Sequence, residues 1–310
     1  MKYRKLLASF LVLSLMTAVL VNPSRYLLSV KNGIILFWST VLPALFPFFF
    51  FTRLLSGLGF PDSVGKTFEK PVKFLFKTPK ISAYVFFMSV LSGYPIGAKL
   101  VSEFYKNNII NEEESKKIIS FCSTSAPLFV IGTIGTFMLE NILESVVILI
   151  AHYLSAIVTG LLFCNVKPLS AKNVKTTYAR PVPENLIGES VNDSVISILS
   201  VGGLIAIFGL LIDVLSDIGF FSLFGNAAPF VAGIFEMTRG AKEIIKNPPE
   251  VHTMIAALTA LVSFGGICIF LQAMTFLAEA KIKASYYLAV KTFQAAAGAG
   301  IAYLISLPLF

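Results

Sequence analysis

Long stretches without a charged residue are the main pattern of this chain. A membrane-spanning helix needs about 20 largely uncharged residues, and nine stretches free of Asp, Glu, Lys and Arg come close to or exceed that length. They are residues 6–24, 33–52, 81–98, 118–139, 145–166, 194–212, 218–235, 251–278 and 292–310. The pattern therefore predicts an all-α polytopic membrane protein.

Two of these stretches are interrupted by glycine and proline. Residues 92–97 read Ser-Gly-Tyr-Pro-Ile-Gly, and residues 225–229 read Gly-Asn-Ala-Ala-Pro. Such interruptions free backbone groups that lipid cannot satisfy, so the broken backbone must be buried in protein or line a cavity. A charged amphipathic stretch follows each interruption. We therefore predict one re-entrant hairpin in segment 81–98 and a second in segment 218–235.

The charges between the stretches test this prediction. With two hairpins, about seven true spans remain, and the basic segments all fall on one side: residues 2–5, 66–80, 167–180 and 281–283. The other side carries Glu140, Glu144, Asp213, Asp217 and a mixed segment from Glu243 to Glu250. Because basic loops stay in the cytoplasm, the N-terminus is expected there too. Counting both hairpins as spans would divide the basic loops between the two sides.

An internal repeat is the next feature. The tripeptide Gly-Ala-Lys at residues 97–99 recurs at 240–242, and the order span, hairpin, polar-interrupted span, span occurs twice. Each unit crosses the membrane an odd number of times, so the second is expected to be inverted, which is the architecture of secondary transporters. The predicted parts are an N-terminal transmembrane anchor (1–32), a first repeat (33–165), a cytoplasmic linker (166–190) and a second, inverted repeat (191–310).

Composition narrows the class of protein. The chain of 310 residues is 56% hydrophobic and 14% charged, with a mean hydropathy of +0.81, which excludes an ordinary soluble domain. Its net charge of +8 comes from loops rather than one polar face, so no nucleic-acid partner is expected. Neither a nucleotide-binding loop nor a hydrolase or metalloprotease motif occurs in the sequence. We therefore expect neither an enzyme nor a bound cofactor.

Ionisable side chains beside the hairpin tips are the first candidates for binding. Lys99 follows the first tip, and Glu236 and Arg239 follow the second, with Thr238 between them. An ionisable group at membrane depth is costly and therefore functional or paired, and arginine can grip a planar carboxylate with two parallel hydrogen bonds. These residues predict a site for a small organic anion. The alternative is that Glu236 and Arg239 satisfy each other while Lys99 extends to the membrane surface.

Polar residues inside the interrupted spans are the second set. Ser123, Thr124 and Ser125 precede a proline, and Gln272 is an isolated amide after a Gly-Gly pair at 265–266 that permits a break. These groups can face a ligand. The alternatives are that the hydroxyls only satisfy the broken helix and that Gln272 bonds a neighbouring helix.

Histidine and cysteine add little chemistry in this sequence. His152 lies in a span and His252 at the entrance of another, and a hydrogen-bonded structural imidazole is favoured over a proton relay. Cys122, Cys164 and Cys268 lie far apart in apolar runs, without the spacing of a metal or redox motif. They are expected to be buried small side chains.

Three motifs carry a family resemblance. Residues 92–99 (SGYPIGAK), 121–129 (FCSTSAPLF) and 235–240 (FEMTRG) resemble the YlbJ-type sporulation integral membrane proteins, in the nucleoside-recognition or Gate group, which is similar in layout to concentrative nucleoside transporters. The resemblance implies a role in endospore formation, with dipicolinate moved across the membrane surrounding the forespore. Two elements depart from the family: its Asn-x-Ser-(Gly/Ser)-Pro reads Ser-Thr-Ser-Ala-Pro at 123–127, and its Arg-x-Leu-His reads Lys-Thr-Phe-Gln at 291–294.

The sequence thus predicts a multi-pass transporter of a small organic anion, with dipicolinate favoured, working by alternating access between the two repeats. The alternatives are a nucleoside–cation symporter and a non-transporting membrane scaffold of a sporulation complex. A coupling cation, Na⁺ or H⁺, and a homo-oligomeric state are left open. The candidate substrate-binding residues are Ser92, Gly93, Tyr94, Pro95, Lys99, Ser123, Thr124, Ser125, Glu236, Thr238, Arg239 and Gln272.

Overall fold

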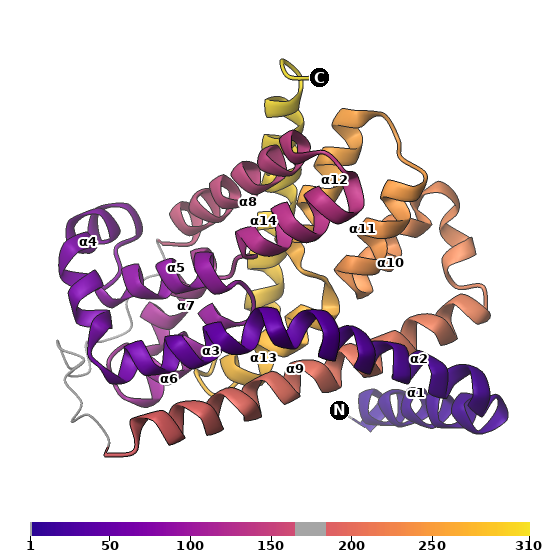
Figure 1. Cartoon of the computed structure of the whole chain (residues 1–310), viewed down its shortest axis with the longest axis horizontal. Helices are drawn as coiled ribbons and strands as arrows, with labels where there is room; N and C mark the ends of the chain where they lie inside the picture. The colour runs from indigo at the N-terminus through magenta and orange to yellow at the C-terminus, as the bar shows by residue number, and fades with distance from the viewer. Residues whose placement is uncertain (1, 165–183) are drawn as a thin grey trace.

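The computed structural model describes residues 2–164 and 184–310, and this part of the chain is built from helices, without strands (Figure 1). The elements before the gap are α1 (Lys2–Val21), α2 (Pro23–Leu36), the π-helical η1 (Phe37–Val41), α3 (Leu42–Gly57), α4 (Phe60–Phe76), α5 (Ile81–Ser92), α6 (Ile96–Lys106), α7 (Glu112–Phe121), the π-helical η2 (Leu128–Leu139) and α8 (Ile142–Phe163). After the gap come α9 (Leu186–Asp217), the 3₁₀ helix η3 (Phe221–Ala227), α10 (Ala228–Phe235), α11 (Met237–Lys246), α12 (Val251–Phe264), α13 (Gly266–Leu277) and α14 (Ala284–Ser306).

Four helical segments of the described chain are long and apolar enough to cross a membrane: α8, α9, α12 with α13, and α14. A fifth candidate is the pair α4 and α5 taken as one span, with a bend of 93° between them. These segments overlap the predicted apolar stretches 145–166, 194–212, 251–278 and 292–310. The prediction of an all-α polytopic membrane protein is therefore confirmed, whereas the total of about seven spans stays a prediction.

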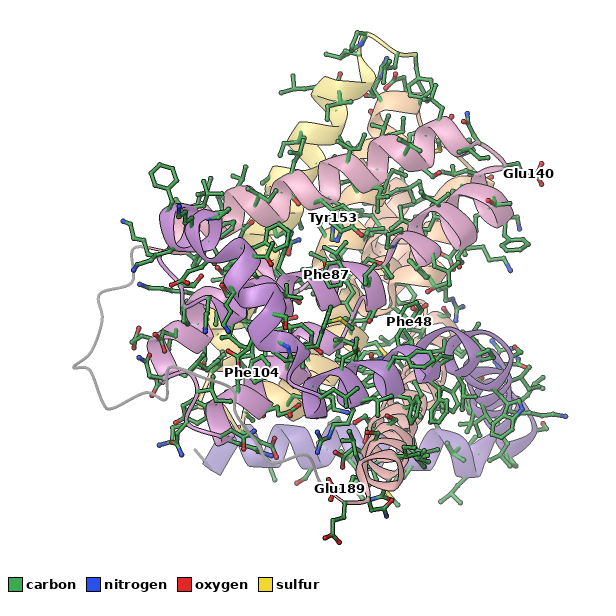
Figure 2. All side chains as sticks on the ribbon, turned by 60° about the vertical axis from the view of Figure 1, so that its left-hand side comes forward. Phe48, Phe87, Phe104, Glu140, Tyr153 and Glu189 are labelled. Carbon is green, nitrogen blue, oxygen red and sulfur yellow. The ribbon has the colours of Figure 1, made fainter. Side chains whose placement is uncertain are left out.

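The long helices run between two ends of the bundle. At one end, Lys106 after α6 pairs with Glu279 after α13 at 2.6 Å, and this end carries α4 (Figure 1). At the opposite end, which carries η3, Arg25 at the start of α2 pairs with Asp217 at the end of α9. Figure 2 shows Glu140, before α8, and Glu189, near the start of α9, at opposite edges of the molecule. We call the two ends of the bundle the α4 end and the η3 end.

Three helices form the centre of the bundle: α8, α12 and α14. Gly298 on α14 faces Ser155 of α8 and Ser263 of α12 so closely that a Cβ on Gly298 would lie 2.9 Å from the Ser263 hydroxyl. Small residues allow helix backbones to approach closely inside a membrane. The Ala- and Gly-rich stretch 295–300 therefore explains how α14 packs against both neighbours.

The first hairpin breaks where the sequence predicts. α5 ends at Ser92, Gly93 has a φ of +75°, and α6 begins after Pro95. Gly97, in the first turn of α6, approaches the carbonyl of Cys122 so closely that any side chain at 97 would overlap that oxygen. Glycine at this position thus lets the hairpin tip pack directly on the chain between α7 and η2.

Two helices near the centre are interrupted, also as predicted. Residues 122–126 separate α7 from η2 and are not helical. α12 and α13 are separated at Gly265 and Gly266, whose φ angles are +85° and +78°. Glycine adopts this left-handed region without a steric cost, so the Gly-Gly pair fixes where the second interruption lies.

The second hairpin reverses at a different place from the predicted one. The predicted interruption at residues 225–229 is present as a kink at Gly225, which has a φ of +49°, and Pro229 then lies in the first turn of α10, where its missing N–H is not needed. The reversal comes at Glu236, which has extended backbone between α10 and α11. Gly233 and Gly240 face each other in the hairpin, so the two helices are in backbone contact.

The predicted boundary at residues 32–33 lies inside α2. Lys31 and Asn32 are exposed on this helix and do not end it. The interruption before α2 is instead at Asn22, whose side chain accepts the N–H of Arg25 and caps the helix. The anchor and the first repeat are therefore joined by a continuous helix.

The predicted boundary at residues 190–191 is also displaced. α9 begins at Leu186, because Asn185 caps it by accepting the N–H of Gly188. Residues 165–183, which hold most of the predicted linker and its basic residues, lie outside the described residues.

The contact between Gly233 and Gly240 generates a stability prediction. Gly240→Ala places a methyl group on the backbone of Gly233, so the midpoint of thermal unfolding in detergent should fall, corresponding to a loss of about 2 kcal/mol. Gly300→Ala on α14 is the control, because nothing lies within 4 Å of a Cβ there. Equal midpoints for the two variants would contradict the close packing of α10 on α11.

Candidate functional site

Buried polar side chains gather where the first hairpin tip meets the two helix interruptions. We call this group the central polar cluster. It consists of residues that are each at most 8% exposed: Tyr94, Ser123, Ser125, His152, Ser263, Tyr287, Lys291 and Gln294. These residues come from the hairpin tip, from both interrupted helices, and from α8 and α14.

Lys291 is the charged residue of this cluster. Its side chain is 1% exposed, and its Nζ lies 2.7 Å from the hydroxyl of Tyr94, 3.0 Å from the carbonyl oxygen of Ser123 and 2.7 Å from Oε1 of Gln294. Nζ also lies 4.6 Å from the centre of the Tyr94 ring. In the described part of the chain no carboxylate forms an ion pair with Lys291. Three neutral oxygens therefore hold a buried amino group.

His152 joins the two interrupted helices. Its Nε2 accepts a hydrogen bond of 2.9 Å from the backbone N–H of Ser125, and its Nδ1 lies 2.9 Å from the hydroxyl of Ser263. Because a backbone amide only donates, Nε2 carries no proton and Nδ1–H points to Ser263. This histidine has the hydrogen-bonded structural arrangement, and in this conformation it has no free nitrogen for a proton relay.

The hairpin tip is bonded to both interruptions. The hydroxyl of Tyr94 lies within 3.2 Å of the Val262 carbonyl and 3.3 Å of the Ser263 carbonyl, at the end of α12. On α5, the Ser89 hydroxyl donates to the carbonyl of Cys122 at 2.8 Å and lies 3.0 Å from the Thr124 hydroxyl. Movement of the first hairpin must therefore break contacts with both interrupted helices.

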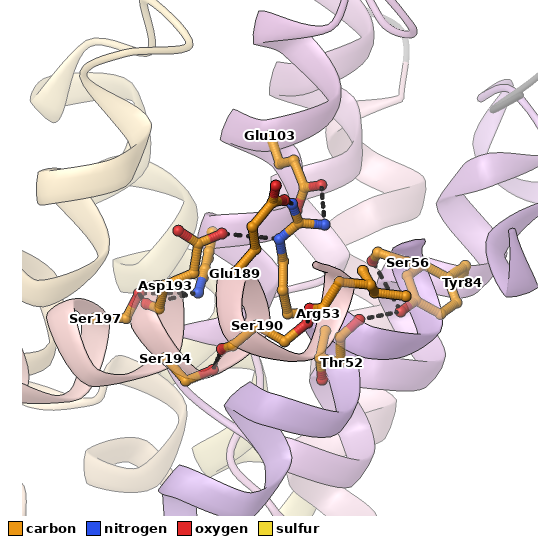
Figure 3. Close-up of polar contacts among 12 residues, drawn as sticks. Thr52, Arg53, Ser56, Tyr84, Glu103, Glu189, Ser190, Asp193, Ser194 and Ser197 are labelled. Carbon is orange, nitrogen blue, oxygen red and sulfur yellow. Dashed lines mark hydrogen bonds and ion pairs between the residues drawn. The ribbon is translucent and has the colours of Figure 1, made fainter. Parts of the chain in front are cut away.

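A second polar region is a cavity of about 460 Å³ that opens at the α4 end. We call it the charged cavity. It lies between α3, α6, α9 and α13 and is lined by Arg53, Lys99, Ser102, Glu103, Lys106, Asn107, Asp193, Ile196, Ser197, Ser200, Thr275, Phe276 and Glu279. Figure 3 shows part of its wall, where α3 meets α9. Its mixed charges suit a polar solute.

Arg53 is the most connected charge of this cavity. Its guanidinium lies 2.8 Å from Asp193, 3.5 Å from Glu189 and 4.0 Å from Glu103 (Figure 3). It therefore links α3 to α9 and to the second helix of the first hairpin. Because the Arg53 side chain is only 12% exposed, water weakens these ion pairs less than it weakens ion pairs between two exposed side chains.

Lys99 projects from α6 toward α9. Its Nζ lies 2.9 Å from the hydroxyl of Ser197 and 3.5 Å from the carbonyl of Asp193, and 5.0 Å from the centre of the Phe49 ring. The ammonium is thus held by neutral groups inside the bundle, and the predicted alternative of an extended, surface-seeking side chain is not what the structure shows.

The structure brings some of the predicted residues together. Tyr94, Ser123 and Ser125 belong to the central polar cluster, and Thr124 lies beside it. Gly93 and Pro95 shape the tip, and Ser92 is fully buried there with no hydrogen-bond partner for its hydroxyl in the described part.

The second hairpin does not join this group. Both carboxylate oxygens of Glu236 accept backbone N–H bonds, from Thr238 at 3.0 Å and Arg239 at 2.8 Å, so this helix N-terminus is already occupied. The Arg239 guanidinium pairs with Asp213 at 2.6 Å and Glu243 at 3.3 Å. Glu236 therefore accepts the backbone N–H of Arg239, in part as the alternative expected. The guanidinium of Arg239 pairs with Asp213 and Glu243 instead of Glu236.

Arg239 and Lys99 also lie on separate elements, since α11 and α6 are on opposite sides of the bundle in Figure 1. That both grip one anion stays a prediction. Gln272 is separate too, because its amide donates to the sulfur of Cys268 at 3.4 Å, on its own helix.

Sequence reasoning missed Lys291, Gln294 and Tyr287 as members of the site. A signal was present, because Lys291 is a lone charge inside the apolar helix α14 and is the reason the last uncharged stretch begins at residue 292. In the sequence, Lys291 was interpreted only as a departure from a family motif. Arg53, at the end of a long apolar stretch, was missed in the same way.

Comparison with known proteins gives one similar protein of this class. No protein-family profile and no solved structure matches the chain. The chain is 26% identical, over an alignment of 340 positions, to the sporulation integral membrane protein YlbJ of Bacillus subtilis (strain 168), covering 98% of this chain and 83% of that protein. The helices define a multi-pass α-helical membrane protein. The chain is therefore similar to a sporulation integral membrane protein over almost its whole length.

The bridging role of His152 generates a prediction. His152→Ala leaves the Ser125 N–H and the Ser263 hydroxyl without their partner in a dry environment, so folding should weaken by about 2 kcal/mol and the thermal midpoint should fall. His252→Ala is the control, since His252 lies at the η3 end, where its Nδ1 is 3.1 Å from the Ser306 hydroxyl. If both variants melt alike, His152 does not join the two helices.

Proposed function

We propose that this protein is a membrane transporter of a small organic anion. The observation that carries the proposal is the central polar cluster, in which a hairpin tip and two helix interruptions meet inside an apolar bundle. Non-helical backbone at membrane depth is tolerated where it is buried in protein or lines a cavity. In secondary transporters, discontinuous helices of this kind hold the substrate near the midplane.

The two halves support a mechanism of alternating access. Each half contains, in order, a long helix, a short connecting helix, a hairpin, an interrupted helix and a closing helix. In the first half these are α2–α3, α4, α5–α6, α7–η2 and α8. In the second half they are α9, η3, α10–α11, α12–α13 and α14. The long helices are antiparallel, because Arg53 near the end of α3 pairs with Asp193 near the start of α9 while the other ends meet through Arg25 and Asp217. This is the relation that an inverted repeat requires.

The closing helices are related in the same way. The start of α14 lies beside the end of α8, because the rings of Tyr286 and Phe163 are 5.8 Å apart, so the two packed helices run in opposite directions. We therefore interpret the halves as two inverted repeats that move against each other.

Charge favours an anionic substrate entering from the α4 end. Lys99 offers an ammonium held only by neutral groups inside the charged cavity. The α4 end also carries Lys66, Lys70 and Lys73 on α4, and basic loops mark the cytoplasmic side. The cavity volume of about 460 Å³ lies in the range of small-molecule pockets.

Dipicolinate is our favoured substrate. The motifs resemble YlbJ-type proteins, and the similar Bacillus subtilis protein is named for sporulation. A rigid aromatic dicarboxylate matches buried lysine donors, and the membrane surrounding the forespore is the proposed location. A Na⁺ or H⁺ gradient is the proposed driving force.

Uptake into proteoliposomes tests the transport proposal. Radiolabelled dipicolinate should enter vesicles containing the purified protein under a Na⁺ or H⁺ gradient. Lys99→Met should reduce the initial rate about tenfold or more, because the substrate loses a charge-assisted contact in the cavity. Lys66→Met, on the exposed face of α4, should leave the rate unchanged.

The other outcomes identify other functions. Uptake of uridine instead of any dicarboxylate would indicate a nucleoside symporter. If no solute moves, and sporulation tolerates Lys99→Met but not substitution of the α4 lysines, the protein is a scaffold.

Cysteine labelling tests the proposed sidedness. The native Cys122, Cys164 and Cys268 are buried, so the parent protein should react slowly with a membrane-impermeant maleimide. Ser200→Cys, in the charged cavity, should label in inside-out vesicles only, and Ser222→Cys, on η3, in right-side-out vesicles only. Labelling of both from one side would overturn the topology.

A further inference from the structure

Lys291 and Gln294 form a donor pair in the centre of the protein. We propose that they bind a carboxylate of the ligand, with Lys291 as its fixed positive charge. This inference rests on the proposed transport of an organic anion, and it adds a point of charge recognition at the central polar cluster to the contact proposed for Lys99 in the charged cavity.

The contacts of Lys291 fit its charged form. Its three acceptors lie at 2.7–3.0 Å, and two of them, the Ser123 carbonyl and the Gln294 amide oxygen, have no proton to donate. The third, the Tyr94 hydroxyl, lies within reach of the Val262 and Ser263 carbonyls for its own proton. With the Tyr94 proton directed to one of those carbonyls, the three oxygens accept three protons from Nζ, which is the ammonium form that this proposal uses.

This ammonium has no counter-ion in the described part of the chain. A buried charge without a partner is strongly destabilising, and at membrane depth such a residue marks a functional site. The other central ionisable group, His152, is held neutral by the Ser125 N–H. A net positive charge therefore remains in the cluster, and an anionic ligand would neutralise it.

Gln294 supplies a second, independent sign of a ligand. Its side chain is 1% exposed, and its Nε2 has no hydrogen-bond partner in the described structure, although its Oε1 is bonded to Lys291. An unpaired buried donor is costly. The ammonium and the free amide N–H thus lie side by side, and the two oxygens of one carboxylate can accept from both.

Binding would also change the contacts of the first hairpin. All three protons of Lys291 are engaged in the structure, so a carboxylate must replace one of the present acceptors. Tyr94 lies on the hairpin tip, and Ser123 lies in the first interruption. Replacement of either oxygen would remove one hydrogen bond between α14 and the first half of the chain, which would couple occupancy of the site to the position of the hairpin tip or of the first interruption.

The experiment uses the full-length protein in detergent and two probes of the same shape. One is pyridine-2,6-dicarboxylate, and the other is the neutral pyridine-2,6-dicarboxamide. Binding is measured by titration calorimetry, and the thermal midpoint is recorded with and without each probe. The variants are Lys291→Met and Gln294→Glu, with Lys242→Met on the exposed face of α11 as the control.

Lys291→Met should weaken dicarboxylate binding about 100-fold and change dicarboxamide binding about threefold or less. Gln294→Glu keeps the lysine and gives it an internal carboxylate. It should therefore also lose dicarboxylate binding and gain stability, and it decides the matter if Lys291→Met does not fold. Lys242→Met should match the parent.

A purely structural role for Lys291 predicts unchanged dicarboxylate affinity in Gln294→Glu, or in a folded Lys291→Met. Either result overturns the inference, as does a parent protein that binds no dicarboxylate. If the parent transports dipicolinate but the two variants transport it equally well, only the inference fails. If binding depends on Lys291 but no vesicle takes up the anion, the site stands and the transport proposal fails.

Discussion

Backbone that leaves the helix inside an apolar bundle must find its hydrogen-bond partners within the protein, and the rest of this structure depends on that constraint. The interruptions at residues 122–126 and at Gly265–Gly266 are answered by side chains from other helices. His152 accepts a hydrogen bond from the N–H of Ser125, and Lys291 donates one to the carbonyl of Ser123. The polar cluster is therefore the means by which a broken membrane bundle holds together.

The same constraint explains why the cluster is suited to function. Residues that satisfy broken backbone do so through buried side chains, and such side chains can exchange one acceptor for another. The Nζ of Lys291 lies at similar distances from three neutral acceptors, and no acidic side chain pairs with it in the described chain. A ligand carboxylate is a better acceptor than any of them. Structure and recognition thus use the same groups.

The sequence was informative wherever a local rule decides the conformation. Uncharged length predicted the long helices, and the Gly-Gly pair and the Ser-Thr-Ser-Ala-Pro segment predicted both interruptions. The second hairpin was misplaced because Pro229 begins α10 instead of breaking it, and the reversal at Glu236 depends on the contact of Gly233 with Gly240. Contacts of that kind are not encoded in a short window of sequence.

The site was harder to predict than the fold for a related reason. Arg239 looked unpaired in the sequence, yet Asp213, distant along the chain, neutralises it. Lys291 looked like a motif departure, yet the fold surrounds it with neutral oxygens from three elements. Whether a charge is paired depends on tertiary neighbours, which composition and periodicity do not give.

The central claim is that Lys291 is a buried ammonium that receives the ligand's carboxylate. Solid-state NMR of the protein in lipid bilayers, with ¹⁵N-labelled lysine side chains and ¹³C-carboxyl dipicolinate, measures this contact directly. The account predicts an ammonium nitrogen signal that is absent from Lys291→Met and shows dipolar coupling to the labelled carboxylate. A neutral amine signal, or an ammonium without coupling at saturating ligand, would contradict it.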